Sequence, residues 1–296
     1  MYLFQKIEEA VFKQFDARRI IGEFLLENRE NLADYTMEDI AKLTHTSKST
    51  LVRFAKHFDY SGWKEFMYAF THEVVQFDNS SLEVDINIPF DQSANTLEII
   101  ENIAKLRIQT IKETSSLMSV SDINKAASIL AESETIVIYG RSPNSYFGEL
   151  FKRNLNTINK KAFLADADES GLISTTLTDK DCAIIISYSG NNPDSYPMKN
   201  VKLLLRNQVP IISITSGGDN YLRDYSTIVL NILSREKLYS KITNFSTEES
   251  IQFILDILYA KVFSLNYEEN MLTKLSNSRS LEIERETTFK DISEDT

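Results

Sequence analysis

Apolar residues recur at helical spacing through the first 77 residues, so this part of the chain is expected to be helix after helix. Further helices are expected to follow Asp16, to begin at Thr36 and near Ser47, and to follow Gly62. The apolar positions of the first helix recur at helical spacing: Leu3, Phe4, Ile7, Val11 and Phe15.

The pattern changes twice further along the chain. Residues 78–92 are rich in Asn, Ser and Asp and contain Pro89, which marks a linker. A long amphipathic helix is expected from residue 93 to about 117, and another over about 121–132. Beyond them, short β-branched runs alternate with helical segments. The five runs are 134–140, 160–165, 182–190, 209–216 and 226–232.

Apolar strands separated by helices are typical of a parallel sheet covered on both faces. The predicted fold class is therefore a helical N-terminal domain joined to an α/β doubly wound domain with a five-stranded parallel sheet. The expected boundaries are a helical domain at 1–77, a linker at 78–92, a sheet domain at 93–270 and a polar tail at 271–296, which is expected to fray beyond about residue 275.

Charge and composition restrict the function. The 296 residues hold 32 Lys and Arg against 43 Asp and Glu, a net charge of −11. Such a chain binds nucleic acid only through a local basic patch. The single cysteine, Cys182, excludes a disulfide framework and a Cys-rich zinc module, and with three histidines no metal or cofactor is expected. The chain has no 18-residue apolar run and no signal-peptide core, so no membrane partner and a cytoplasmic location are expected.

Residues 36–66 have the layout of a helix-turn-helix. A helix over Met37–Leu43 is followed by a three-residue turn and by Ser47, an N-cap residue type. Residues 41–64 hold five bases against one acid, Asp59. A solvated basic face on a helical hairpin is the alternative to a recognition helix. The side chains expected to contact DNA are Lys48, Ser49, Thr50, Arg53, Lys56 and Lys64.

The run from Ser47 to Lys56, followed by Tyr60-Ser61-Gly62-Trp63, resembles the N-terminal domain of RpiR-type bacterial transcriptional regulators. The resemblance implies a helix-turn-helix coupled to a sugar-phosphate-binding SIS (sugar isomerase) domain. The family usually has Gly where this chain has Asp59. Such a Gly would end the recognition helix in a left-handed conformation, which Asp tolerates less well.

Two hydroxyl-rich loops follow predicted strands in the second half of the chain. They are Gly140-Arg141-Ser142-Pro143-Asn144-Ser145 and Ser187-Tyr188-Ser189-Gly190-Asn191-Asn192. Ligands of doubly wound sheets bind outside the carboxyl ends of the strands. Glycine, backbone N–H groups and serine hydroxyls there are able to cradle a phosphate without a lysine. Neither loop has a dinucleotide or Walker pattern.

The second loop is similar to the Ser-x-Ser-Gly-x-Thr phosphate loop of SIS domains, with Asn192 where Thr is usual. The first is similar to the corresponding stretch of glucosamine-6-phosphate synthase isomerase domains. Arg141 is unusual there, and either pairs with a second acidic group of the ligand or points outward. The resemblance implies a ligand-binding set of Ser142, Asn144, Ser187, Tyr188, Ser189 and Asn192.

Three functions are consistent with this sequence. The first is a ligand-responsive transcriptional regulator of carbohydrate metabolism, without turnover, whose operator affinity changes when a phosphorylated sugar or amino sugar binds. The second is a phosphosugar isomerase or lyase with an appended helical domain, for which Glu248 and Glu249 are the shortlisted carboxylates. The third is a sugar-phosphate-binding protein that has lost DNA binding. Because one helix-turn-helix reads a half-site, a homodimer or tetramer is expected.

Overall fold

The N-terminal part of the chain is a bundle of short helices. The structure is a computed structural model that describes residues 2–13, 16–78, 84–233 and 235–282. The bundle closes around a core that includes Phe54, Phe66 and Phe70. Its elements are α1 (Leu3–Lys13), α2 (Ala17–Glu27), the 3₁₀ helix η1 (Arg29–Asp34), α3 (Met37–Leu43), α4 (Lys48–His57) and α5 (Trp63–Asp78).

Three helices of the bundle start close to the predicted positions, and each of these starts has a side-chain cap. The Asp16 carboxylate accepts the Arg18 N–H at the start of α2. Thr36 and Asp39 form a reciprocal capping box on α3, and the Ser47 hydroxyl accepts the Thr50 N–H at the start of α4. Side chains that satisfy unpaired N–H groups stabilise short helices by about 1 kcal/mol each. The expected helix–turn–helix of residues 37–57 is thus confirmed.

Helix α4 ends through Asp59, which has a φ of 67°. The Asp59 N–H donates to the Lys56 carbonyl and the Tyr60 N–H donates to the Ala55 carbonyl. This pair of bonds is a Schellman ending, which needs a left-handed residue at the position of Asp59. The aspartate therefore adopts the conformation that the usual glycine would adopt.

We expect Asp59→Gly to stabilise the helical domain by about 0.5–1 kcal/mol, because glycine removes the left-handed penalty of a Cβ. Urea unfolding followed by the fluorescence of Trp63, the only tryptophan and buried in this domain, measures the change. Asp59→Ala is the matched control and should lower the midpoint. A midpoint that falls in the glycine variant would contradict this account of the helix end.

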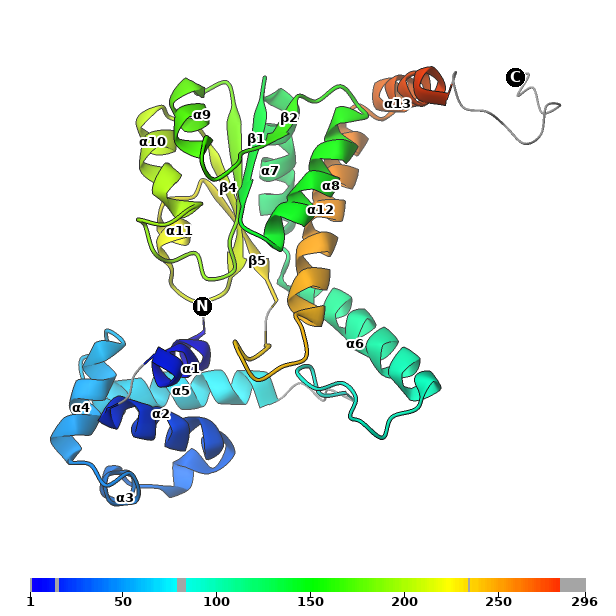
Figure 1. Ribbon diagram of the computed structural model, residues 1–296. Helices are drawn as coiled ribbons and strands as arrows, with labels where there is room; N and C mark the ends of the chain where they lie inside the picture. Colours follow the sequence, from blue (N-terminus) through cyan, green and yellow to red (C-terminus); the bar gives the residue numbers. More distant parts are fainter. Residues whose placement is uncertain (1, 14–15, 79–83, 234, 283–296) are drawn as a thin grey trace.

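The second half of the chain folds around a five-stranded parallel sheet with strand order β2-β1-β3-β4-β5 (Figure 1). The predicted fold class is confirmed. In the register, Ile136 pairs with Cys182 and Gly140 pairs with Ile186. The strands are β1 (Ile136–Gly140), β2 (Ala162–Leu164), β3 (Cys182–Ile186), β4 (Ile211–Ser216) and β5 (Ile228–Ile232).

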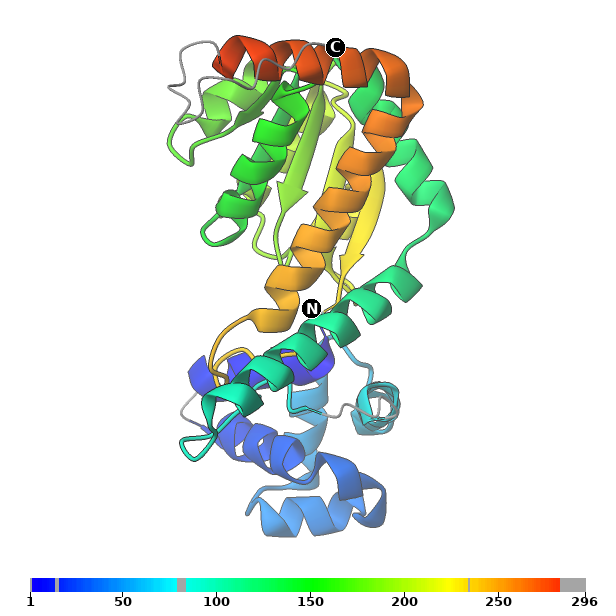
Figure 2. The same ribbon diagram turned by 90° about the vertical axis from the view of Figure 1, so that its right-hand side faces the viewer.

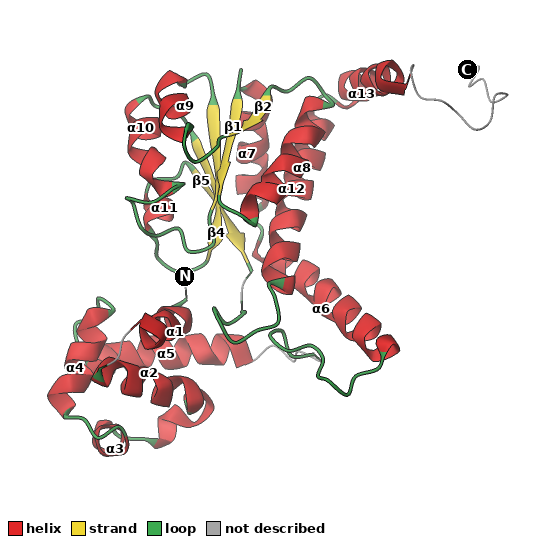
Figure 3. Ribbon diagram, viewed as in Figure 1, coloured by secondary structure: helices red, strands yellow, loops and turns green. Residues whose placement is uncertain are grey.

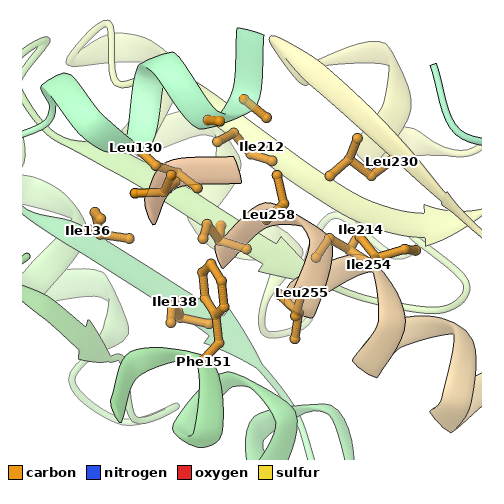
Figure 4. Close-up of a cluster of buried hydrophobic side chains, with 14 of the residues drawn as sticks. Leu130, Ile136, Ile138, Phe151, Ile212, Ile214, Leu230, Ile254, Leu255 and Leu258 are labelled. Carbon is orange, nitrogen blue, oxygen red and sulfur yellow. The ribbon is translucent and has the colours of Figure 1, made fainter. Parts of the chain in front are cut away.

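Helices cover both faces of the sheet, and each face has its own apolar core (Figure 3). On one face, Ile138 and Ile212 meet Phe151 and Leu258 (Figure 4). This face is covered by α7 (Val120–Glu132), α8 (Asn144–Asn156) and α12 (Phe245–Leu265). The other is covered by α9 (Ser170–Thr176), the 3₁₀ helix η2 (Met198–Asn200), α10 (Val201–Arg206) and α11 (Tyr221–Asp224).

Hydrogen bonds between buried hydroxyl groups join the long helix α6 (Thr96–Leu117) to α12. The Thr110 hydroxyl donates to Ser246, and the Thr114 hydroxyl donates to Ser250, all four residues being buried. The apolar stripe expected on this helix lies mostly outside that contact. Three of its members are exposed: Leu97, Ile100 and Ile108.

The expectation of a frayed tail beyond about residue 275 is wrong for residues 275–282, which are helical. Tyr267–Glu282 form helix α13, which crosses the end of the sheet domain (Figure 2). Asn277 donates to the Thr157 carbonyl, and Asn270 donates to the Phe263 carbonyl. Because hydrogen bonds of asparagine side chains hold this helix, its sequence has no apolar periodicity from which the helix could be predicted. The rest of the predicted tail, 283–296, lies outside the described residues.

Candidate functional site

The two hydroxyl-rich loops meet at the carboxyl end of the sheet, between β1 and β3. The strand order 2-1-3-4-5 reverses its direction of growth at this pair of strands. Connections that leave β1 and β3 toward opposite sides open a crevice at such a switch point. The Asn144 side chain joins the two loops by donating to the Ile186 carbonyl at 3.4 Å.

A cavity of about 310 Å³ occupies this crevice. Such a volume accommodates a phosphorylated hexose. Arg141 and Glu9 are the charged side chains in its wall. The complete lining is Glu9, Arg141, Asn144, Ile186, Ser187, Ser189, Asn191, Asn192, Ser195, Tyr196, Pro197 and Met198.

The loop after β3 depends on Gly190. Its φ is 60°, and a Cβ there would lie 2.3 Å from Oδ1 of Asn220 and 2.8 Å from Oγ1 of Thr215. No other residue type fits without moving these neighbours. The Gly190 N–H donates to the Ser187 hydroxyl at 3.3 Å, which gives the loop a tight bend beside the cavity.

Asn192 also adopts a left-handed conformation, with a φ of 65°. Its side-chain oxygen accepts the Asp194 N–H at 3.3 Å and so forms an Asx turn. Asparagine tolerates this backbone region, whereas a β-branched threonine does not. The Asn found here in place of the usual Thr therefore matches the local backbone, and its amide nitrogen is the remaining donor group.

The Tyr196 hydroxyl, beside the cavity, links the end of β1 to the residue that follows β2. It donates to the Ala165 carbonyl at 2.6 Å and accepts the Gly140 N–H at 3.1 Å. Burial raises the pKa of the Tyr196 hydroxyl, while the Gly140 N–H lowers it. The hydroxyl therefore stays protonated at neutral pH and keeps both hydrogen bonds.

The structure brings four of the six predicted ligand-binding residues to the cavity: Asn144, Ser187, Ser189 and Asn192. Ser142 is exposed and does not line it, and neither does Tyr188. Glu248 and Glu249 also lie outside the lining, and Glu249 pairs with Arg107 at 2.6 Å.

Sequence reasoning missed several lining residues. Ser195 and Tyr196-Pro197-Met198 follow the Ser187–Asn192 loop closely in the sequence, so their proximity to that loop was an available signal. Glu9 lies more than 130 residues before the loops, in the other domain, and no local pattern links it to them.

Five of the six predicted DNA-contacting side chains are exposed on the helical bundle. Lys48, Ser49, Arg53 and Lys56 are exposed on α4, Thr50 is half-buried, and Lys64 is exposed at the start of α5. The Arg53 guanidinium donates to the Thr50 hydroxyl at 3.3 Å, which aims it along the helix N-terminus. Lys48 pairs with Glu38 of α3 at 3.0 Å, an exposed contact that costs little to break.

No helix in the described part of the chain combines the length and apolar character that crossing a bilayer requires.

Comparison with known proteins gives one match in the helical domain and one in the sheet domain. Residues 1–76 match the helix-turn-helix domain of the rpiR family, and residues 129–251 match the SIS domain. An uncharacterised HTH-type transcriptional regulator of Providencia stuartii is 24% identical over 272 residues, which cover 91% of this chain and 94% of that protein.

Solved structures share the fold. The Vibrio vulnificus NanR protein complexed with ManNAc-6P matches with a TM-score of 0.59 at 19% identity, covering 94% of this chain and 97% of its own. A putative sugar-phosphate isomerase from Listeria monocytogenes matches with a TM-score of 0.51 at 16% identity, covering 61% of this chain and 98% of its own.

Proposed function

Because the chain belongs to the RpiR family of transcriptional regulators, with a helix-turn-helix domain followed by a SIS domain, we propose that a phosphorylated sugar or amino sugar binds its β1/β3 cavity and alters its affinity for operator DNA. In this proposal residues 1–77 bind DNA, residues 78–92 link the domains and residues 93–270 bind the effector. The observation that carries it is the convergence of both hydroxyl-rich loops on one cavity.

The cavity suits a phosphate at one end. Ser187 and Ser189 supply hydroxyls, and the left-handed residues Gly190 and Asn192 turn the loop backbone around them. Alternating backbone conformations of this kind direct N–H groups into a concave anion site. Arg141 adds a positive charge to the wall, where it would pair with the phosphate or with a second acidic group of the ligand.

The DNA-binding part of the proposal rests on α4. Its polar N-terminal residues would face base edges, while Arg53 and Lys56 would contact bases or phosphates. Since one α4 reads a half-site, two copies must be held together. The exposed Leu97, Ile100 and Ile108 of α6 support a homodimer or tetramer built on that helix.

A combined binding assay tests the function. A duplex selected by the purified protein from a random-sequence pool is titrated with and without glucose 6-phosphate, glucosamine 6-phosphate and ManNAc-6P. We expect at least one of them to raise the melting temperature and to change the operator Kd by about fivefold or more. If all three leave both quantities unchanged, the effector role is wrong for these ligands.

The same incubations test the enzymatic alternative, because NMR of the sugars detects any isomer or cleavage product. We expect none. The shortlisted Glu248 and Glu249 do not line the cavity, so neither is placed to act as a general base there.

A further inference from the structure

The wall of the cavity is built by both domains. Eleven of its twelve lining residues lie between positions 141 and 198, and the twelfth is Glu9 on α1 of the helical domain. The carboxyl ends of the strands point toward this domain in both views (Figures 1 and 2). The DNA-binding domain therefore places a carboxylate at the effector site.

Neighbouring residues on the same face of α1 hold Glu9 in place. The Gln5 side chain donates to the Glu236 carbonyl at 2.8 Å in a buried bond. The Glu8 carboxylate accepts the Leu238 N–H at 2.7 Å. The Phe12 ring stacks on Tyr239 with centroids 4.3 Å apart. Positions 5, 8, 9 and 12 form one helix face, so these contacts fix the direction in which Glu9 points.

The Glu9 carboxylate has the chemistry that sugar recognition needs. It pairs with Lys13 one turn later on the same helix, and its side chain is 36% exposed. A carboxylate only accepts hydrogen bonds, so its partners on a ligand are hydroxyl or ammonium groups and not a phosphate. The serine loop supplies the donors for the phosphate. The cavity thus has hydrogen-bond donors at the serine loop and a hydrogen-bond acceptor, Glu9, on the side formed by α1.

The geometry points to a bridging role for Glu9, resting on the proposed function: with the phosphate in the Ser187–Asn192 loop, Glu9 accepts hydrogen bonds from the hydroxyl or amino groups of the sugar. The effector is then contacted by both domains and stabilises their docked arrangement. By linkage, any change that weakens docking must also weaken effector binding. Inorganic phosphate has no sugar moiety and does not use Glu9.

Glu9→Gln in the full chain tests the contact, because it removes the charge and keeps the size. For the tightest binder among glucose 6-phosphate, glucosamine 6-phosphate and ManNAc-6P, calorimetry should show a Kd raised by about tenfold, with the affinity for inorganic phosphate unchanged. Glu149→Gln is the matched control, since Glu149 pairs with Lys152 on its own helix and lies outside the cavity. An unchanged or lower Kd in Glu9→Gln would overturn the bridge.

Tyr239→Ala tests the linkage without touching the cavity. Tyr239 is 46% exposed and supports α1 through Phe12, so its loss should raise the Kd for the same sugar phosphate by about three- to tenfold. Tyr225→Ala, which removes a similarly exposed ring on α11's C-terminal side, is the control.

Failure of the bridge and failure of the proposed function give different results. If the wild type binds, Ser189→Ala does not, and both Glu9→Gln and Tyr239→Ala bind as the wild type does, the bridge is wrong and the effector site stands. If the wild-type protein binds none of the sugar phosphates, both the proposed function and the bridging role of Glu9 are wrong.

Discussion

Replacing Ser187 and Ser189 together by alanine should abolish the thermal stabilisation of this protein by sugar phosphates. Both side chains line the β1/β3 cavity, and the Ser187 hydroxyl also accepts the Gly190 N–H that shapes the loop. Hydrogen bonds to a charged group contribute about 1.5–3 kcal/mol each. Losing two of them should weaken binding by at least about 100-fold. Thermal shift and calorimetry on the double variant measure the loss.

The double variant should still bind the selected operator duplex, because neither serine is near α4. Ser264→Ala, at an exposed position on α12 in the same domain, is the matched control and should bind the sugar phosphate normally. Stabilisation that survives in the double variant would place the effector elsewhere in the molecule.

Arg53→Ala should weaken operator binding by about 10- to 100-fold, since one well-placed arginine–base contact is worth about 1–3 kcal/mol. Lys56→Ala should weaken binding to all sequences alike and reduce the slope of log Kd against log salt by about one, as expected for a lost phosphate contact. Both side chains are exposed on α4 and one turn apart. Fluorescence anisotropy at several salt concentrations separates the two effects.

Lys125→Ala on α7 is the matched control for the loss of one positive charge, and it should leave both the affinity and the salt slope unchanged. Equal operator affinity in Arg53→Ala, Lys56→Ala and the wild type would remove α4 as the recognition helix.

Sequence patterns predicted the helix starts and the strands well, because both can be recognised from residues close in sequence. The helices that follow Asp16, Thr36 and Ser47 start close to where the sequence predicted them, because a side-chain oxygen two or three residues before the N–H groups determines a helix start. The five strands were recognisable because a parallel sheet buried on both faces needs continuous apolar runs. Helix α13 was missed because it is held by asparagine side chains such as Asn270 and Asn277, whose contacts are not periodic.

The candidate site was predictable in part for a similar reason. Ser187, Ser189 and Asn144 lie beside strand ends, and the sheet topology gathers strand ends at one edge. Glu9 belongs to a different domain, and its position depends on how α1 docks on the segment that holds Glu236 and Tyr239. Such docking depends on tertiary contacts between distant parts of the chain, which residue spacing does not encode.

The way α6 is attached has a mechanical consequence. Hydrogen bonds of Thr110 and Thr114 fix its C-terminal half to α12, while its first ten residues extend away from the sheet toward the linker (Figure 1). A helical segment of that length spans about 15 Å, so a tilt of about 10° at the fixed half swings the free end by about 3 Å. A small rotation at the start of α12 would therefore move the free end of α6, and the linker that joins it, over a larger distance than the rotation moves α12 itself.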